Sequence, residues 1–538
     1  MARNTWYRLD NVGKFYSSQA GSPRQTVFRF SATLVEDVDP ETLQYALIKT
    51  VELFPNFNVC LRSGVFWHYL EPSGDVPLAL PETLPVCYGL HLNARSVLFR
   101  VTYHGPRVNF EVSHMVSDGR GSLSFFKALI YIYLRERYHL EGISVEYDGS
   151  DHQKAENSFD KYFEPESAGS THVPKAYRLR GWHDVCDPTF MELHLPVSRV
   201  LGLAHEWGVS LTSLLAAVLV VSLRDEMPRK DRGRTICFDI PVDLRSHFKS
   251  TTAMNFFGLA YLSYTPGDAD EPVEEVARAM NAQLKAGTRP DHLKLRMNRM
   301  VELEKNPLLR FAPLFMKDLV LGIADAISAR GTTATVSNIG AIRIDERLVP
   351  YVRDFNILTS TTGLKFTICS FGDDLSVGMA TAYSNHAVLK NFCRFFTARG
   401  IPARMNVSKS REEVAADMMA AEFERSVMRL GAKDEGEKAQ AEGNAEPAVE
   451  AEGDATGTAP KGRKASKKAS EKAAEKAVAK ERKAAAKQGK ATAKAETRAR
   501  RLQEKADRAQ AKAERARERA AAGRDAGTTK GGAEDETL

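Results

Sequence analysis

The composition of the chain changes at Gly431, and this change confines a folded core to the residues before it. From Gly431 to Leu538 the sequence contains no aromatic residue, no cysteine and no histidine. A segment with so little apolar surface cannot offset the conformational entropy that folding would cost it. We therefore predict a low-complexity tail over residues 431–538, rich in Ala, Lys, Glu and Arg, and a folded part within residues 1–430.

The positive charge of the chain lies in this tail. The 538 residues include 75 Lys and Arg and 69 Asp and Glu, a formal net charge of +6. Residues 1–430 hold 49 basic and 49 acidic side chains, and this balance argues against a nucleic-acid-binding core. Residues 461–530 hold 24 basic and 9 acidic side chains. They favour either nonspecific contact with an anionic partner, such as nucleic acid or polyphosphate, or a solubilising spacer.

The tail itself is expected to be disordered or, over residues 470–522, a solvated single helix supported by i,i+4 charge pairs. Elsewhere the sequence gives no sign of export or of a membrane span. Residues 1–10 lack the apolar stretch of a signal peptide, and the longest apolar run, residues 211–223, is shorter than the roughly 20 residues that a bilayer requires. The six cysteines are scattered without a CxxC pair, so we expect reduced thiols, no metal site and a cytoplasmic protein.

Two stretches of mixed helix and strand pattern are separated by a polar connection. Residues 1–150 contain alternating strand-like segments and a helix that begins at Asp39-Pro40. Residues 151–190 are polar and irregular and indicate a crossover linker. Residues 191–430 again mix strands with helices, one of which, over residues 212–224, is nearly all apolar and therefore buried. The pattern predicts an α/β (α+β) fold.

The strongest chemical signal is the sequence from His114 to Gly119, which reads HxxxDG. His114 ends an apolar strand, and two glycines then let the chain turn into a helix, so the imidazole can face a cleft from a fixed backbone. A histidine suits general-base chemistry because its ordinary pKa is near 6.5. A buried histidine beside an ordinary Asp-Gly turn is the alternative interpretation.

This motif resembles the signature of the CoA-dependent acyltransferase superfamily. That group includes chloramphenicol acetyltransferase, peptide-synthetase condensation domains, plant BAHD acyltransferases and polyketide-associated acyltransferases. The resemblance covers about residues 1–400 and is closest to bacterial alcohol-acetyltransferase-like proteins. It also rests on WYRLD at residues 6–10, FP at 54–55, FW at 66–67, NSF at 157–159, PVDLR at 241–245, NFFG at 255–258 and SNIG at 337–340.

The resemblance implies two chloramphenicol-acetyltransferase-like halves, residues 1–150 and 191–430, each a mixed sheet flanked by helices, with a channel between them. His114 would be the general base and Asp118 a structural residue. The downstream Arg245 would hold the Asp118 carboxylate, and Gly119 would let the backbone approach the reacting centre. For Arg245 an exposed charge at a strand end, and for Gly119 a turn glycine with positive φ, are the alternatives.

Two further residues are implied across the channel. Ser337 or Asn338 would donate to the oxyanion or position the acceptor, although a polar turn that closes a strand is the alternative. We expect Asn255 and Gly258 to pack between the halves rather than to take part in the chemistry. The plant DFGWG motif and the second histidine of condensation domains are absent, since Ser113 precedes His114.

The sequence analysis therefore predicts an acyltransferase that moves an acyl group, acetyl by family resemblance, from acyl-CoA to a small alcohol or amine. Acyl-CoA is a co-substrate and no bound cofactor is expected. Two alternatives remain open: a non-catalytic binding or regulatory protein whose basic tail recruits a partner, and a thioesterase. A dinucleotide site is disfavoured because Ser124 replaces the third glycine of the GxGxxG pattern.

Overall fold

The fold is built around two large β-sheets and the helices that pack against them. The computed structural model describes residues 6–20, 25–90, 93–145, 150–165, 175–267, 270–305, 312–417 and 419–420. The chain divides into two units, Met1–Asp434 and Glu435–Leu538. The second unit, and with it the predicted basic tail, lies outside the described residues.

The first large sheet has five strands and places His114 at one of its ends. Its order is β12 (Val352–Thr359), β2 (Val27–Leu34), β7 (Arg107–Ser113), β6 (Phe99–His104) and β5 (Ala79–Pro81). The pairs from β12 to β6 are antiparallel, and β5 runs parallel to β6. A smaller sheet, in the order β1 (Tyr7–Arg8), β4 (His68–Pro72) and β3 (Val59–Ser63), lies near the N-terminal end of the described residues.

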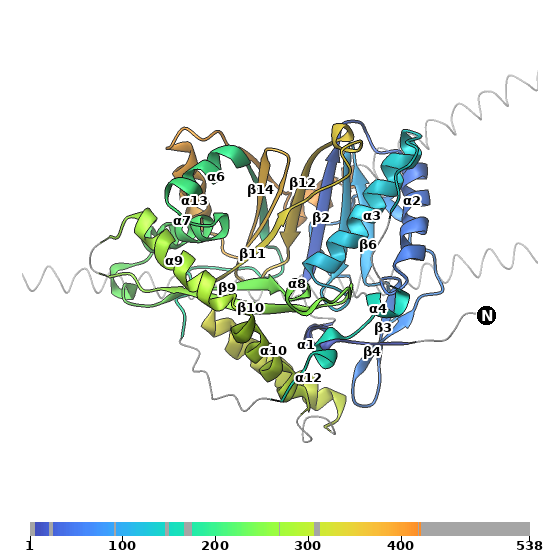
Figure 1. Ribbon diagram of the computed structural model, residues 1–538, viewed down its shortest axis with the longest axis horizontal. Helices are drawn as coiled ribbons and strands as arrows, with labels where there is room; N and C mark the ends of the chain where they lie inside the picture. Colours follow the sequence, from blue (N-terminus) through green and yellow to red (C-terminus); the bar gives the residue numbers. More distant parts are fainter. Residues whose placement is uncertain are drawn as a thin grey trace, which may run out of the picture. The chain divides into compact units, whose positions relative to one another are not determined.

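Two helices pack against the five-stranded sheet. α2 (Pro40–Leu53) begins where the sequence predicts it, because the Asp39 side chain accepts a hydrogen bond from the backbone N–H of Thr42 and Pro40 occupies the first turn. α3 (Gly119–Arg137) follows β7 directly. Figure 1 shows the two helices side by side over β2 and β6, and their apolar faces share one buried core with those strands.

The second large sheet has seven strands and carries the other wall of the cavity described below. Its order is β10 (Phe257–Tyr264), β9 (Ile236–Asp243), β11 (Ala334–Ala341), β13 (Leu364–Phe371), β14 (Asp374–Thr381), β8 (Thr189–Pro196) and β15 (Arg404–Val407). Its core is covered by α6 (Val197–Glu206), α7 (Leu211–Asp225), α9 (Val273–Gly287) and α13 (Ala387–Thr397) (Figure 1). The mixed α/β class that the sequence predicts is confirmed.

One strand joins the two parts of the fold. β12 comes from the second half of the sequence, between β11 and β13, but it pairs with β2 in the five-stranded sheet. The division into halves at residues 1–150 and 191–430 stays a prediction, and β12 shows that the second segment gives a strand to the sheet of the first. The end of β12 therefore lies close to both sheets.

The apolar helix predicted over residues 212–224 is a core helix. α7 is buried along most of its length and ends at Asp225. Of the helices in the described ranges, none is both long and apolar enough to cross a membrane by itself. α6 and α7 meet that criterion only as a pair that bends by 85°.

Candidate active site

His114 lies between the end of β7 and the start of α3. Its backbone N–H donates to the carbonyl oxygen of Thr26 at 3.0 Å, which ties this turn to the start of β2. The side chain is only 6% exposed, and three aromatic rings surround it. Tyr16 stacks on the imidazole with 4.3 Å between ring centroids, and the rings of Phe28 and Phe257 lie 4.5 and 5.6 Å away. The imidazole is therefore held in a fixed, largely apolar setting.

Burial also fixes the charge of His114. It lowers the pKa of the imidazole to about 4, since the charged form loses its hydration, and the positive charge of Lys365 contributes in the same direction. The negative charge of Asp118 and the hydrogen bond to Asn255 oppose this shift without cancelling it. His114 is accordingly a neutral imidazole at neutral pH, which is the form that accepts a proton.

The side chain of Asn255 selects which nitrogen of His114 accepts that proton. Its Nδ2 faces three acceptors: the two carboxylate oxygens of Asp10, at 3.2 and 3.0 Å, and the backbone oxygen of His114 at 3.1 Å. This places the amide NH₂ on that side, so Asn255 Oδ1 faces the ring and accepts from His114 Nδ1 at 2.8 Å. Nδ1 then carries the hydrogen, and Nε2 keeps the lone pair.

Asp10 holds Asn255 from behind. It is fully buried, and its carboxylate also accepts the backbone N–H groups of Asn255 at 3.0 Å and Gly13 at 2.6 Å. Burial raises the pKa of this carboxyl to about 6, although the hydrogen bonds from Gly13 and Asn255 oppose the shift. The sequence places Asp10 only within the WYRLD segment, and for Asn255 it predicts packing between the halves, so this arrangement of the two residues was not predicted.

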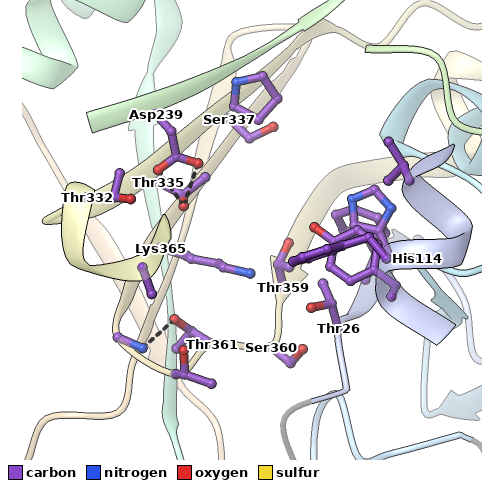
Figure 2. A pocket seen from close by; sticks show the side chains of 18 of the residues that line it. Thr26, His114, Asp239, Thr332, Thr335, Ser337, Thr359, Ser360, Thr361 and Lys365 are labelled. Atoms are coloured by element: carbon purple, nitrogen blue, oxygen red, sulfur yellow. Dashed lines mark hydrogen bonds between the residues drawn. The ribbon is translucent and has the colours of Figure 1, made fainter. Parts of the chain in front are cut away.

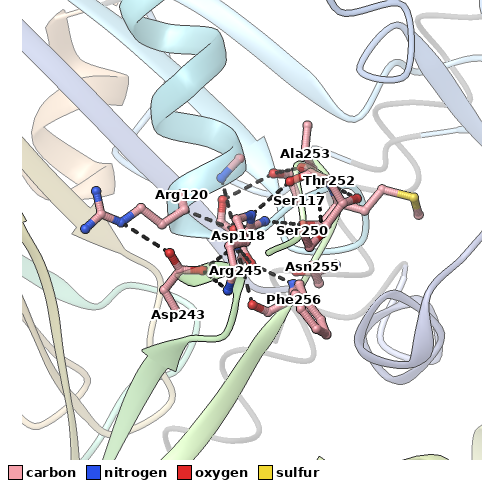
Figure 3. Close-up of polar contacts among 12 residues, drawn as sticks. Ser117, Asp118, Arg120, Asp243, Arg245, Ser250, Thr252, Ala253, Asn255 and Phe256 are labelled. Carbon is pink, nitrogen blue, oxygen red and sulfur yellow. Dashed lines mark hydrogen bonds and ion pairs between the residues drawn. The ribbon is translucent and has the colours of Figure 1, made fainter. Parts of the chain in front are cut away.

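Asp118 caps α3 and is clamped by Arg245. The Asp118 carboxylate accepts from the backbone N–H groups of Arg120, Gly121 and Phe256 at 3.1, 3.0 and 2.7 Å. Two Arg245 nitrogens reach its two oxygens at 2.9 and 3.0 Å (Figure 3). Burial opposes ionisation of Asp118, but Arg245 and the N–H donors outweigh it and hold the pKa of the carboxyl below its ordinary value.

Arg245 extends this clamp to the segment that carries Asn255. It donates to the backbone oxygens of Thr252 at 2.9 Å and Met254 at 2.6 Å, and to the carboxylate of Asp243 at 2.9 Å. The structure thus brings Arg245 and Asp118 together, as the sequence predicts, with Arg245 largely buried rather than exposed at a strand end. The pair positions Asn255 through the backbone on either side of it.

The two glycines of the motif make room for close contacts. Gly119 is not among the glycines with positive φ. A Cβ atom at Gly119 would lie 2.6 Å from the Ile339 side chain, and one at Gly121 would lie 2.1 Å from the carbonyl oxygen of Ala253. Because the second contact is with backbone, Gly121 is the more constrained position.

Of the two residues predicted across the cavity, Asn338 uses its side chain in hydrogen bonds within the protein, whereas Ser337 does not. A bulge separates Asn338 from Gly340 in β11. Asn338 Nδ2 donates to Thr212 Oγ1 at 2.8 Å, and its Oδ1 accepts from the Gly340 N–H at 2.8 Å. The Ser337 hydroxyl lines the cavity and makes no hydrogen bond to the part of the chain that the structure describes. Only Ser337 is therefore available to contact a bound molecule.

All of these groups adjoin one large cavity. His114, Asp118, Gly119, Arg245, Ser337 and Asn338 all line it, and its volume is about 1370 Å³. Sites for drug-sized ligands measure about 300–1,000 Å³, so this cavity is large enough for two substrates. Figure 2 shows His114 on one wall and Ser337 on the opposite one. In the described ranges, no group of three or more His, Cys, Asp or Glu side chains is arranged to hold a metal ion.

The fold resembles those of several solved proteins. One is F. sporotrichioides TRI101 complexed with coenzyme A and T-2, at 11% identity and a TM-score of 0.51, covering 74% of this chain and 99% of that one. Another is the first condensation domain of the CDA synthetase, at 16% identity and a TM-score of 0.50, covering 73% of this chain and 94% of that one. These likenesses show a shared fold: the chain has the overall fold of TRI101 and of a peptide-synthetase condensation domain.

A family model also matches part of the sequence. Residues 197–348 match the family model described as phthiocerol/phthiodiolone dimycocerosyl transferase C-terminus. This match covers the stretch from α6 to just beyond β11, which includes Arg245, Asn255 and Ser337. No curated protein matches the sequence. Fold and family match together support an acyltransferase.

Proposed function

We propose that the chain is an acyl-CoA-dependent acyltransferase that moves an acyl group from the thioester to an alcohol or amine, with His114 as the general base. The observation that carries this proposal is the hydrogen bond from His114 Nδ1 to Asn255 Oδ1, since it leaves the Nε2 lone pair for the acceptor. Acyl-CoA is a co-substrate, and the neutral, buried imidazole needs no cofactor to act as a base.

The reaction follows from this arrangement. Nε2 takes the proton of the acceptor hydroxyl or amine as the acceptor atom attacks the thioester carbonyl carbon. The tetrahedral intermediate then expels the CoA thiolate, which takes the proton back from Nε2 and leaves as the thiol. No covalent bond to the enzyme forms. The negative charge on the intermediate requires a donor, and the available Ser337 hydroxyl is the candidate; loss of one such donor typically costs about 100- to 1000-fold in rate.

The positioning residues act through His114. Asn255 keeps Nδ1 protonated and the ring oriented, and Asp10 keeps the Asn255 amide from turning over. Asp118 and Arg245 fix the turn after β7 and the segment before β10. They touch no reacting atom in this scheme.

The test is release of free CoA from acetyl-, octanoyl- and palmitoyl-CoA by the full-length protein, with and without mixtures of alcohols and amines. His114→Gln removes the base and is expected to lower acceptor-dependent release by about 100- to 10,000-fold. His205→Gln, on the exposed surface of α6, is the matched control and should release CoA at the original rate.

The outcomes separate the alternatives. Release that requires an acceptor and is lost only in His114→Gln supports the transferase. Release that needs no acceptor and is lost in the same variant contradicts acyl transfer and indicates a thioesterase. No release from any donor, or equal release by both variants, contradicts a catalytic role and points to a binding protein.

A further inference from the structure

A row of polar side chains crosses the seven-stranded sheet on the face that lines the cavity. Asp239 on β9 pairs in register with Thr335 on β11, and Thr335 pairs with Lys365 on β13. Residues in one register across a sheet direct their side chains to the same face. All three line the cavity that contains His114 (Figure 2). The Thr335 hydroxyl lies 2.9 and 3.1 Å from the two carboxylate oxygens of Asp239, so these two partner each other.

Lys365, at the end of this row, has no such partner. In the described part of the chain its ammonium group makes no hydrogen bond and no ion pair. Figure 2 shows this group directed across the cavity, toward Thr359 and His114. Burial lowers the pKa of the ammonium, while the negative charge of Asp239 opposes the change. The positive charge of Lys365 also contributes to the lowered pKa of the His114 imidazole.

Thr359 supplies a second polar group at the same place. It is the last residue of β12 and pairs with Phe28, whose ring lies 4.5 Å from that of His114. Its side chain is 4% exposed, and its hydroxyl has no hydrogen-bond partner among the described residues. A buried hydroxyl without a partner is unfavourable, so a ligand that accepts its hydrogen would bind favourably there.

We propose that Lys365 and Thr359 form a carboxylate-binding site beside His114, so that the acceptor of the acyl group is a hydroxy acid or an amino acid. This inference rests on the proposed acyl transfer and names the class of its acceptor. The acceptor carboxylate lies between the Lys365 ammonium and the Thr359 hydroxyl, both of which donate to it. Its hydroxyl or amino group then faces Nε2 of His114.

The charges at this wall favour a carboxylate over other ligands. A single ammonium group matches one negative charge. The carboxyl groups of Asp239 and Asp325 also act on Lys365, and they would repel a doubly charged phosphate more strongly than a singly charged carboxylate. A ligand with a net positive charge would in turn be repelled by Lys365 itself.

The test compares matched pairs of probes that differ in this charge and by one methyl group. Binding of 3-hydroxydecanoate and L-phenylalanine, each against its methyl ester, is measured by calorimetry on the full-length protein without acyl-CoA, and decyl phosphate is a further arm. We expect each acid to bind about 10- to 100-fold more tightly than its ester, because hydrogen bonds to a charged group are the strong ones. The same pairs are then compared as acceptors in CoA release.

Two variants and one control locate the preference. Lys365→Met removes the charge at similar volume, and Thr359→Val removes only the hydroxyl. We expect the first to reduce the ratio of acid to ester binding by tenfold or more and the second to reduce it several-fold. Thr359→Val also serves if Lys365→Met fails to fold. Lys285→Met, on the exposed face of α9, should keep the original ratio.

Each of three binding results would overturn this site: equal binding of acid and ester by the original protein, an equal loss of both in Lys365→Met, or tighter binding of decyl phosphate than of either acid. The last would indicate a phosphate site instead. CoA release with esters but not with acids also contradicts it while leaving the acyltransferase intact. Tight acid binding that depends on Lys365, with no CoA release from any donor, contradicts the acyltransferase and not the site.

Discussion

Asn255 Oδ1 accepts the Nδ1 hydrogen of His114 across 2.8 Å, although the two residues are 141 positions apart in the sequence. His114 comes from the end of a strand in the five-stranded sheet, and Asn255 from the segment that leads into β10 of the other sheet. The orientation of the proposed base therefore depends on a contact between the two sheets. A substitution that weakens this hydrogen bond should therefore lower the rate of catalysis more than it changes the shape of the cavity.

Replacing Asn255 by alanine should lower kcat by about 100-fold, with little change in KM for acyl-CoA. The reason is that the imidazole can then adopt the other tautomer, in which Nε2 carries the hydrogen and cannot act as a base. The measurement is steady-state CoA release together with thermal unfolding. A parallel rise in KM with unchanged kcat would contradict a positioning role for Asn255.

The protonation state of His114 can be followed directly by NMR with labelled histidine. The pKa of its imidazole, lowered by burial to about 4, predicts a neutral ring with hydrogen on Nδ1 throughout pH 6–8. The fraction of active base is then constant over that range, whereas a histidine with the ordinary pKa of 6.5 would lose it as the pH falls. The His114→Gln spectrum identifies the signal among those of the 13 histidines. Titration near pH 6.5, or hydrogen on Nε2, would show that the site is not preorganised.

Breaking the pair of Asp118 and Arg245 should be costly. Arg245→Ala leaves a buried carboxylate without its main partner, and such losses typically reduce the free energy of unfolding by about 3–5 kcal/mol. The double variant Asp118→Asn with Arg245→Ala should recover part of this loss, since no buried charge remains unpaired.

The control is Arg347→Ala, which breaks the exposed pair of Arg347 and Asp345 and should leave the free energy of unfolding almost unchanged. Chemical denaturation of the four proteins gives the comparison. If Arg245→Ala were no more destabilising than Arg347→Ala, the ion pair of Arg245 with Asp118 would not contribute to the stability of the fold.

Local patterns in the sequence predict much of the fold, because they depend on neighbouring residues. The cap at Asp39, the strand before His114 and the apolar face of α7 are all visible in this way. The Asp118–Arg245 pair was available only through resemblance to a family. The sequence did not predict the contacts between distant segments. In these contacts β12 pairs with β2, Asp10 orients Asn255, and the Asn338 amide donates a hydrogen bond to Thr212. These contacts depend on how the two large sheets pack against each other. Neither the hydrophobic periodicity of a segment nor the spacing of a motif determines that packing.

The last prediction concerns the second glycine of the motif. Gly121→Ala would place a methyl group 2.1 Å from the Ala253 carbonyl oxygen and 2.4 Å from Ser117 Oγ, which itself donates to that oxygen at 2.6 Å. Because the obstacle includes backbone, the helix start and the Ala253 segment must separate. This displaces Asn255, two residues further on, from His114. We expect loss of more than 90% of CoA release and a lower melting temperature.

Two other glycines provide the comparison. Gly119→Ala meets only the flexible end of Ile339, so its effect should be milder and should be reversed by the added change Ile339→Ala. Gly202→Ala, at a helical position in α6 with open space around it, should stabilise the protein by about 0.5–1 kcal/mol. If Gly121→Ala behaved like Gly202→Ala, the close approach of the two segments, and with it the coupling of Asp118, Arg245 and Asn255 to His114, would be wrong.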